Sequence, residues 1–303
     1  MTDRQSPPFL GMIEPMEPIR KTLILPHIQL SYLEWFTGPE PVLLLHGLGD
    51  HARVWSDLAI ALGDRYHLVA LDMRGHGESD KPTQGYTFTE LIGDLEALLD
   101  HLGWSQVHGI AHSWTAKLLP IWATAAPQRL ASMVLVDPFY INKMPGFVNF
   151  TFPLLYKVLP FLQGMGPFSS YAVAEAKART LNQFQGWSSL QQQVFTEGIE
   201  QKADGSWGSK FTVPARNEIF QESVAVSGLT APIDIPTLLV QPEQGINRRA
   251  SNLKTYQTYL NQLQVERLPG NHWPFLVEAE HFNPAVIEFL RLHPLANGRE
   301  GDG

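Results

Sequence analysis

The stretch Val107-His108-Gly109-Ile110-Ala111-His112-Ser113-Trp114-Thr115 decides the fold of this chain. Residues 107–110 are typical of a short buried strand, and helical sequence follows the stretch. The bend between strand and helix would leave the Ser113 hydroxyl standing clear. Such a turn is the nucleophile elbow, usually written G-x-S-x-G. Ala111 and Thr115 replace the two glycines. The elbow is therefore altered, and Thr115 adds a β-branched side chain where space is short.

Strand-like and helix-like segments alternate on both sides of the elbow. The continuously apolar runs, typical of strands buried on both faces, are residues 41–45, 67–71, 133–136 and 236–240. Helical spacing is found at residues 54–62, 88–102, 252–263 and 284–292. Two further strands are predicted at the start, at 22–25 and 28–35, and a short one at 265–268. Such alternation predicts an α/β fold with a mostly parallel, doubly wound sheet and helices on both faces.

The alternation stops after Asp137. Residues 138–227 are rich in aromatic residues, proline and glycine and show no strand rhythm. We interpret them as a helical cap or lid inserted into a core formed by residues 1–137 and 228–303. An aromatic cap favours a substrate with a large apolar part, because small-molecule pockets are mostly apolar.

Composition excludes several classes of function. The chain has 303 residues, a net charge of −8 and no cysteine. The acidic balance argues against nucleic acid as the main partner, and the missing thiols exclude disulfides and a cysteine nucleophile. Neither a signal peptide nor an apolar run long enough to span a bilayer is evident. We expect a cytoplasmic protein that acts on a small molecule without a cofactor or metal; composition leaves the oligomeric state open.

Ser113 and His272 are the candidate reactive pair. A serine hydroxyl is a weak nucleophile until a neighbouring base takes its proton, and histidine is the usual base. His272 follows the predicted strand at 265–268 and precedes the last helix. Two backbone N–H groups would hold the developing oxyanion, those of Trp114 after the serine and of Leu48 in the loop after an early strand.

The order of these motifs resembles the α/β-hydrolase superfamily, in its serine-nucleophile branch. The resemblance rests on His46-Gly47-Leu48-Gly49, Asp72-Met73-Arg74-Gly75-His76-Gly77-Glu78-Ser79, His112-Ser113 and Pro269-Gly270-Asn271-His272, and covers residues 22–292. It implies a Ser–His–acid triad, but says little about substrate, because this fold hosts many chemistries.

The acid is the largest departure from the family pattern. The family usually places it after the strand at 236–240, where this chain has Gly245 in the turn Pro242-Glu243-Gln244-Gly245. Two carboxylates could substitute: we expect Asp137, at a position used by some branches of the superfamily, and Glu243 is the alternative. The third alternative is that no acid supports the histidine.

Three functions follow from these residues. The main hypothesis is a serine hydrolase that cleaves an ester or related acyl bond through an acyl-enzyme on Ser113. The second is a cofactor-independent oxygenase or lyase that uses His272 and Asp137 as a dyad. The third is a non-catalytic ligand-binding protein on a hydrolase fold.

Overall fold

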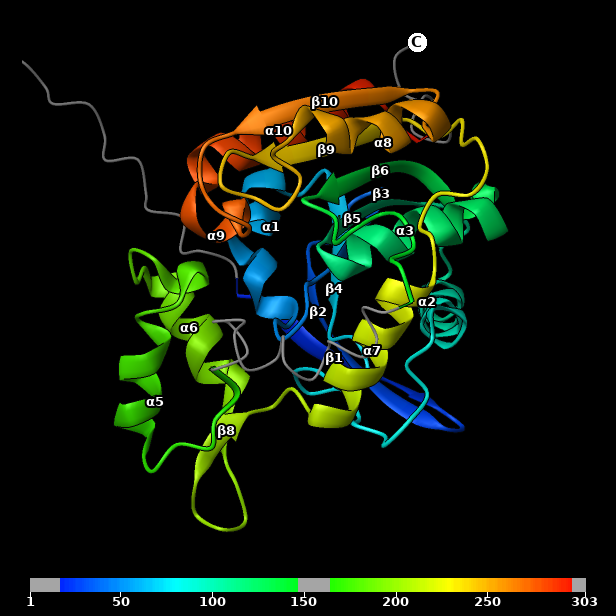
Figure 1. Ribbon diagram of the computed structural model, residues 1–303. Helices are drawn as coiled ribbons and strands as arrows, with labels where there is room; N and C mark the ends of the chain where they lie inside the picture. Colours follow the sequence, from blue (N-terminus) through cyan, green and yellow to red (C-terminus); the bar gives the residue numbers. More distant parts are fainter. Residues whose placement is uncertain (1–16, 147–163, 296–303) are drawn as a thin grey trace, which may run out of the picture.

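An eight-stranded sheet forms the centre of the molecule (Figure 1). The computed structural model describes residues 17–146 and 164–295. The strand order is β1-β2-β4-β3-β5-β6-β9-β10; the pairs β1–β2 and β2–β4 are antiparallel, and the other pairs are parallel. The strands are β1 Ile19–Leu25, β2 Ile28–Trp35, β3 Glu40–Leu45, β4 Tyr66–Leu71, β5 Val107–His112, β6 Leu130–Val136, β9 Thr237–Pro242 and β10 Leu263–Leu268. The predicted mostly parallel sheet is confirmed.

Helices cover both faces of this sheet. Alternate residues of a strand point to opposite faces, so Leu43 and Leu45 pack in one core while Val42 and Leu44 pack in the other. The first core includes α2 and α3, and the second includes α1 and α10. The helices around the sheet are α1 Ser56–Leu62, α2 Phe88–Leu102, α3 Trp114–Ala125, α8 Leu253–Tyr259, α9 Pro274–Val277 and α10 Ala279–Leu292, with 3-10 turns at Ala52–Trp55, Pro127–Arg129 and Ala250–Asn252.

Two helix boundaries differ from the sequence prediction. The last helix begins at Ala279 rather than at Pro284, and the proline lies inside it. Proline was expected at the first helical position, which suits its missing N–H, but here it follows a turn of helix. The helix expected over residues 252–263 ends at Tyr259, because Leu263 already pairs with Thr237 as the first residue of β10.

The described part of the predicted cap lies outside the main sheet (Figure 1). It contains α5 Tyr171–Ala178, a 3-10 turn Asn182–Phe184, α6 Ser189–Gly198, β7 Ile199–Gln201, β8 Trp207–Ser209 and α7 Val213–Ala225. The antiparallel pair β7–β8 was not expected, because strands of three residues are too short to show alternation. Residues 147–163 of the predicted insertion lie outside the described residues, and its boundaries stay a prediction. Among the described residues, no helix is both long and apolar enough to cross a lipid bilayer.

Candidate active site

Ser113 occupies the bend between β5 and α3. Its backbone has φ 60° and ψ −116°, a left-handed conformation that is costly for a residue with a side chain. Two hydrogen bonds to β6 and the loop after it hold it there. The Ser113 N–H donates to the Val136 carbonyl at 2.9 Å, and the Ser113 carbonyl accepts from the Phe139 N–H at 3.0 Å. The strain therefore persists because β6 and the loop after it fix both sides of the bend.

The Thr115 side chain is held in the elbow by contacts of its hydroxyl with the backbone. Its hydroxyl is fully buried and lies 2.8 to 3.1 Å from the carbonyl oxygens of Leu45, His46 and His112. It also accepts the His112 N–H at 3.2 Å. The hydroxyl therefore bonds the start of α3 to the ends of β3 and β5, and the expectation that a β-branched residue is short of space here stays a prediction.

His272 connects Ser113 with Asp137. The His272 Nε2 atom lies 3.0 Å from Ser113 Oγ, and Nδ1 lies 2.5 Å from Asp137 Oδ2. The serine follows β5, the aspartate follows β6 and the histidine follows β10. Because these strands are parallel, their carboxyl ends meet at one edge of the sheet. The side chains of Ser113, His272 and Asp137 therefore meet within hydrogen-bond distance, with His272 between the other two.

Asp137 is held by the loop that follows β9. Its fully buried carboxylate accepts hydrogen bonds from the Ile246 N–H at 2.8 Å, the Asn247 N–H at 3.0 Å and the Asn247 side-chain amide at 3.1 Å. Burial alone raises the pKa of Asp137, but the contact with His272 and these backbone donors outweigh it and hold the pKa below its ordinary value. Asp137 is therefore an ionised acceptor for the imidazole N–H.

Glu243 and Gly245 occupy the loop where the family usually carries the acid. The Glu243 side chain is exposed. A Cβ atom added to Gly245 would lie 2.5 Å from Asp137 Oδ2, well inside contact distance. The Asp137 carboxylate thus fills the space that a side chain at residue 245 would need. Of the two candidate acids, only Asp137 lies within hydrogen-bond distance of His272 among the described residues.

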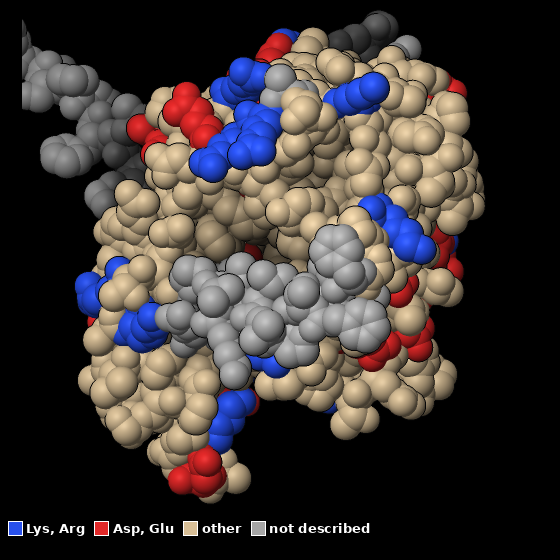
Figure 2. Space-filling model, in the orientation of Figure 1, with Lys and Arg blue, Asp and Glu red and all other residues tan. Residues whose placement is uncertain are grey.

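A largely apolar cavity of about 280 Å³ opens beside Ser113. Its walls are Leu48, His112, Ser113, Trp114, Phe139, Tyr140, Ile219, Phe220, Ser223, Ile246, His272 and Trp273. Figure 2 shows the surface hollowed near the middle of one face, mostly among uncharged residues. Size and lining suit a small molecule with an apolar part.

Leu48 and Trp114 flank this cavity, as the oxyanion prediction requires. Trp114 is the first residue of α3, so its N–H has no acceptor within the helix. Leu48 lies in the turn after β3. Gly47 lets that turn approach the elbow, because a Cβ there would lie 2.4 Å from His112 Nδ1. That the two N–H groups hold an anionic oxygen stays a prediction.

His112 and Asp50 are buried residues next to the loop that carries His272, and the sequence did not predict a role for either of them. His112 Nε2 donates to the His272 carbonyl at 2.8 Å. The Asp50 carboxylate accepts from Trp273 Nε1 at 3.0 Å. Both contacts steady the loop that carries His272. Only their places in the sequence could have indicated a role for these two residues. His112 directly precedes Ser113, and Asp50 ends the glycine-containing turn after β3.

Comparison with known proteins identifies the family of the chain. The model of the alpha/beta hydrolase fold family matches residues 40–279. The chain belongs to this family. The resemblance inferred from the motifs is therefore confirmed over most of the chain.

Curated relatives match shorter segments. Epoxide hydrolase 2 of Siraitia grosvenorii is 32% identical over 167 residues, which are 53% of this chain and 51% of the relative. The 2-(acetamidomethylene)succinate hydrolase of Mesorhizobium japonicum is 32% identical over 119 residues, 39% and 42% of the two chains. The acetyltransferase component of the acetoin cleaving system of Cupriavidus necator is 34% identical over 111 residues, 37% and 30%. The chain thus spans about a third to a half of the length of these relatives.

Solved structures extend the likeness to the whole fold. An E-2-(acetamidomethylene)succinate hydrolase superposes with a TM-score of 0.72 at 21% identity, over 90% of this chain and 99% of the other. The thioesterase domain from the curacin biosynthetic pathway gives 0.70 at 20% identity, over 90% and 99%. At such identities the likeness shows the fold alone.

Proposed function

We propose that the protein is a serine hydrolase that cleaves an ester or related acyl bond of a largely apolar small molecule. The observation that carries the proposal is the hydrogen-bonded series from Ser113 Oγ through His272 to Asp137, at 3.0 and 2.5 Å. In this scheme Ser113 is the nucleophile, His272 the general base and Asp137 the triad acid.

The course of the reaction would depend on which ring nitrogen of His272 carries the proton. Nδ1–H of His272 donates to the Asp137 carboxylate, which leaves Nε2 free to accept the serine proton. As Ser113 Oγ bonds to the substrate carbonyl carbon, His272 takes that proton and then passes it to the leaving group. Water repeats the sequence on the acyl-enzyme, which releases the acid and restores Ser113.

The oxyanion formed at each step would lie between the N–H groups of Leu48 and Trp114. Removing one donor of an oxyanion hole commonly costs about 10² to 10³ in kcat. The side chains of Phe139, Ile219 and Phe220 in the same cavity would take the apolar part of the substrate.

Labelling of Ser113 tests the proposal directly. The purified chain is treated with a fluorophosphonate, digested and examined by mass spectrometry, and is assayed for burst kinetics with activated acyl esters. We expect the label on Ser113 and a burst of about one equivalent. Ser113→Ala should lose both, whereas Ser251→Ala, a matched change at an exposed serine, should keep both. No label and no burst would reject the proposal.

The other two hypotheses predict different results. For a cofactor-independent oxygenase or lyase, turnover would depend on His272 and Asp137 and would persist in Ser113→Ala. For a non-catalytic binding protein, ligands would bind without turnover. The 3.0 Å contact between Ser113 Oγ and the histidine supports a nucleophile, because a group that only positions substrate has no need of a base.

A further inference from the structure

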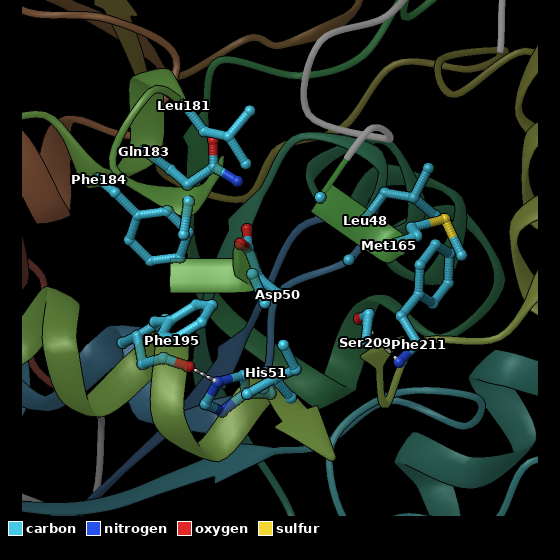
Figure 3. Close-up of a pocket in the computed structure, with 17 residues that line it drawn as sticks. Leu48, Asp50, His51, Met165, Leu181, Gln183, Phe184, Phe195, Ser209 and Phe211 are labelled. Atoms are coloured by element: carbon cyan, nitrogen blue, oxygen red, sulfur yellow. Dashed lines mark hydrogen bonds between the residues drawn. The ribbon is translucent and has the colours of Figure 1, made fainter. Parts of the chain in front are cut away.

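A second cavity lies on the other side of Leu48 (Figure 3). It has a volume of about 70 Å³ and is lined by the turn after β3 and by α5, α6 and the adjoining residues of the predicted cap. One water takes about 30 Å³ of liquid volume, so the space suits a group of very few heavy atoms. Leu48 lines both cavities, so the two lie against the same residue.

Asp50 supplies a carboxylate to this small cavity. The residue is only 7% exposed. In Figure 3 its carboxylate points into the space and faces the side-chain amide of Gln183. A buried carboxylate is costly unless it is hydrogen-bonded and its charge compensated. Among the described residues its carboxylate accepts one hydrogen bond, from Trp273 Nε1 at 3.0 Å.

Among the described residues, His112 is the neighbour that counteracts the burial of the Asp50 carboxylate and lowers its pKa, and it carries a positive charge only when protonated. The ring atom closest to Asp50 is Nδ1 of His112, at 3.6 Å. His112 already donates its N–H from Nε2 to the His272 carbonyl, and a neutral imidazole has only one N–H. Burial, and to a lesser extent His272, lower the pKa of His112, which keeps the ring neutral. His51, the other ionisable residue in the lining, contacts the Val194 carbonyl through Nε2 at 2.8 Å (dashed line in Figure 3).

The rest of the lining favours a hydrogen-bond donor with a positive charge. Gln183 has a buried Oε1 atom that accepts no hydrogen bond from the described residues. The rings of Phe184, Phe195 and Phe211 form much of the wall, and aromatic faces attract cations. An ammonium group has three donors and no acceptor, so it complements a carboxylate, an unpaired amide oxygen and aromatic rings together.

We propose that this cavity binds a small primary ammonium group, and that the natural substrate carries such a group next to its scissile acyl bond. The second half of the proposal rests on the acyl hydrolysis proposed for Ser113; the ammonium site itself does not. The apolar part of the substrate would then lie in the larger cavity, with the reacting carbonyl near Leu48 between the two.

Binding of two probes of nearly equal size, n-butylammonium and 1-butanol, tests the site without any turnover. Titration calorimetry on the intact chain should give n-butylammonium an affinity at least about tenfold higher than that of 1-butanol, since hydrogen bonds between charged groups are the stronger ones. Asp50→Asn keeps an acceptor for Trp273 Nε1 but removes the charge, and should abolish the preference. Asp204→Asn, the same change at an exposed turn of the predicted cap, should retain it.

Two further measurements complete the test. Gln183→Leu should reduce the preference for n-butylammonium over 1-butanol severalfold. This variant tests the site if the Asp50 variant does not fold. With an activated ester as substrate, n-butylammonium should inhibit competitively and 1-butanol much less. Equal affinity of the wild type for both probes, or an unchanged preference in folded Asp50→Asn, would overturn the ammonium site. A clear preference without any ester hydrolysis would keep the site and reject the serine hydrolase.

Discussion

The Asp137 carboxylate and Gly245 occupy one place in the fold. A Cβ atom on Gly245 would lie 2.5 Å from Asp137 Oδ2, so a side chain at residue 245 and the observed position of Asp137 exclude each other. The loop after β9, where the family usually carries the acid, instead gives the aspartate the N–H groups of Ile246 and Asn247. The glycine at residue 245, where the family usually has the acid, and the carboxylate at residue 137 are therefore parts of a single structural change.

Asp137→Asn should lower kcat by about 10³ to 10⁴, the cost expected when a triad acid no longer orients the histidine and stabilises the imidazolium. Steady-state kinetics with an activated ester measures it. Glu243→Gln should stay within about twofold of the wild type, because the Glu243 side chain is exposed. A large loss in the Glu243 variant with a small one in Asp137→Asn would reverse the assignment of the acid.

The acid should be movable between the two loops. Gly245→Ala alone should impair activity, since its Cβ would displace the Asp137 carboxylate. The double variant Asp137→Ala/Gly245→Asp frees that space and returns a carboxylate to it, so its kcat should exceed that of Asp137→Ala by about tenfold or more. Circular dichroism checks that each variant folds. A folded double variant no more active than Asp137→Ala would show that residue 245 cannot serve the histidine.

Thr115→Val should destabilise the chain by about 1 to 3 kcal/mol, the usual cost of leaving buried hydrogen-bonding groups unsatisfied. The change keeps the shape of the side chain but removes the hydroxyl that contacts the carbonyls of Leu45 and His46. Urea unfolding measures the loss, and Thr258→Val on the exposed surface of α8 is the matched control. Equal stability of the two variants would mean that the hydroxyl does not anchor the elbow.

Stability should fall as the pH falls from about 6.5 towards 4. Burial lowers the pKa values of His46 and His108 to about 4 in the folded chain. Between the ordinary histidine pKa and that value the unfolded chain binds more protons, so acid favours unfolding. Each histidine should cost about 2 kcal/mol between pH 6.5 and 5.

Urea unfolding at several pH values in this range measures how steeply the free energy of unfolding changes with pH. His108→Asn retains a polar group for Ser132 and should make the slope shallower, since one titrating group is removed. The same slope in wild type and variant would show that His108 does not contribute.

Much of the fold could be predicted because it depends on local pattern. Continuous apolar runs such as residues 41–45 indicate strands covered on both faces, and helical spacing over 88–102 matches α2 at both ends. Boundaries were less accurate where a partner decides them. The start of β10 follows from the pairing of Leu263 with Thr237, which no local pattern records.

The candidate site divides in the same way. Ser113 and His272 could be identified from their motifs, because each lies at the end of a predicted strand and parallel strands end at one edge of a sheet. The sequence favoured Asp137 with Glu243 as the alternative, but the contact itself could not be predicted, since it depends on which carboxylate reaches the imidazole across two loops. Asp50 and Gln183 lie 133 residues apart in the chain, and only folding brings them to one cavity.

By itself, the sequence determined the alternation of strands and helices and the family. It also identified Ser113 at the altered elbow and His272 in the late loop. These features are encoded in short runs of residues with a fixed period or spacing. Only the tertiary structure decided that Asp137 lies against His272, that Thr115 anchors the elbow and that Asp50 faces a small cavity. Those relationships depend on distances between side chains of different strands and loops, which form only when the sheet is assembled.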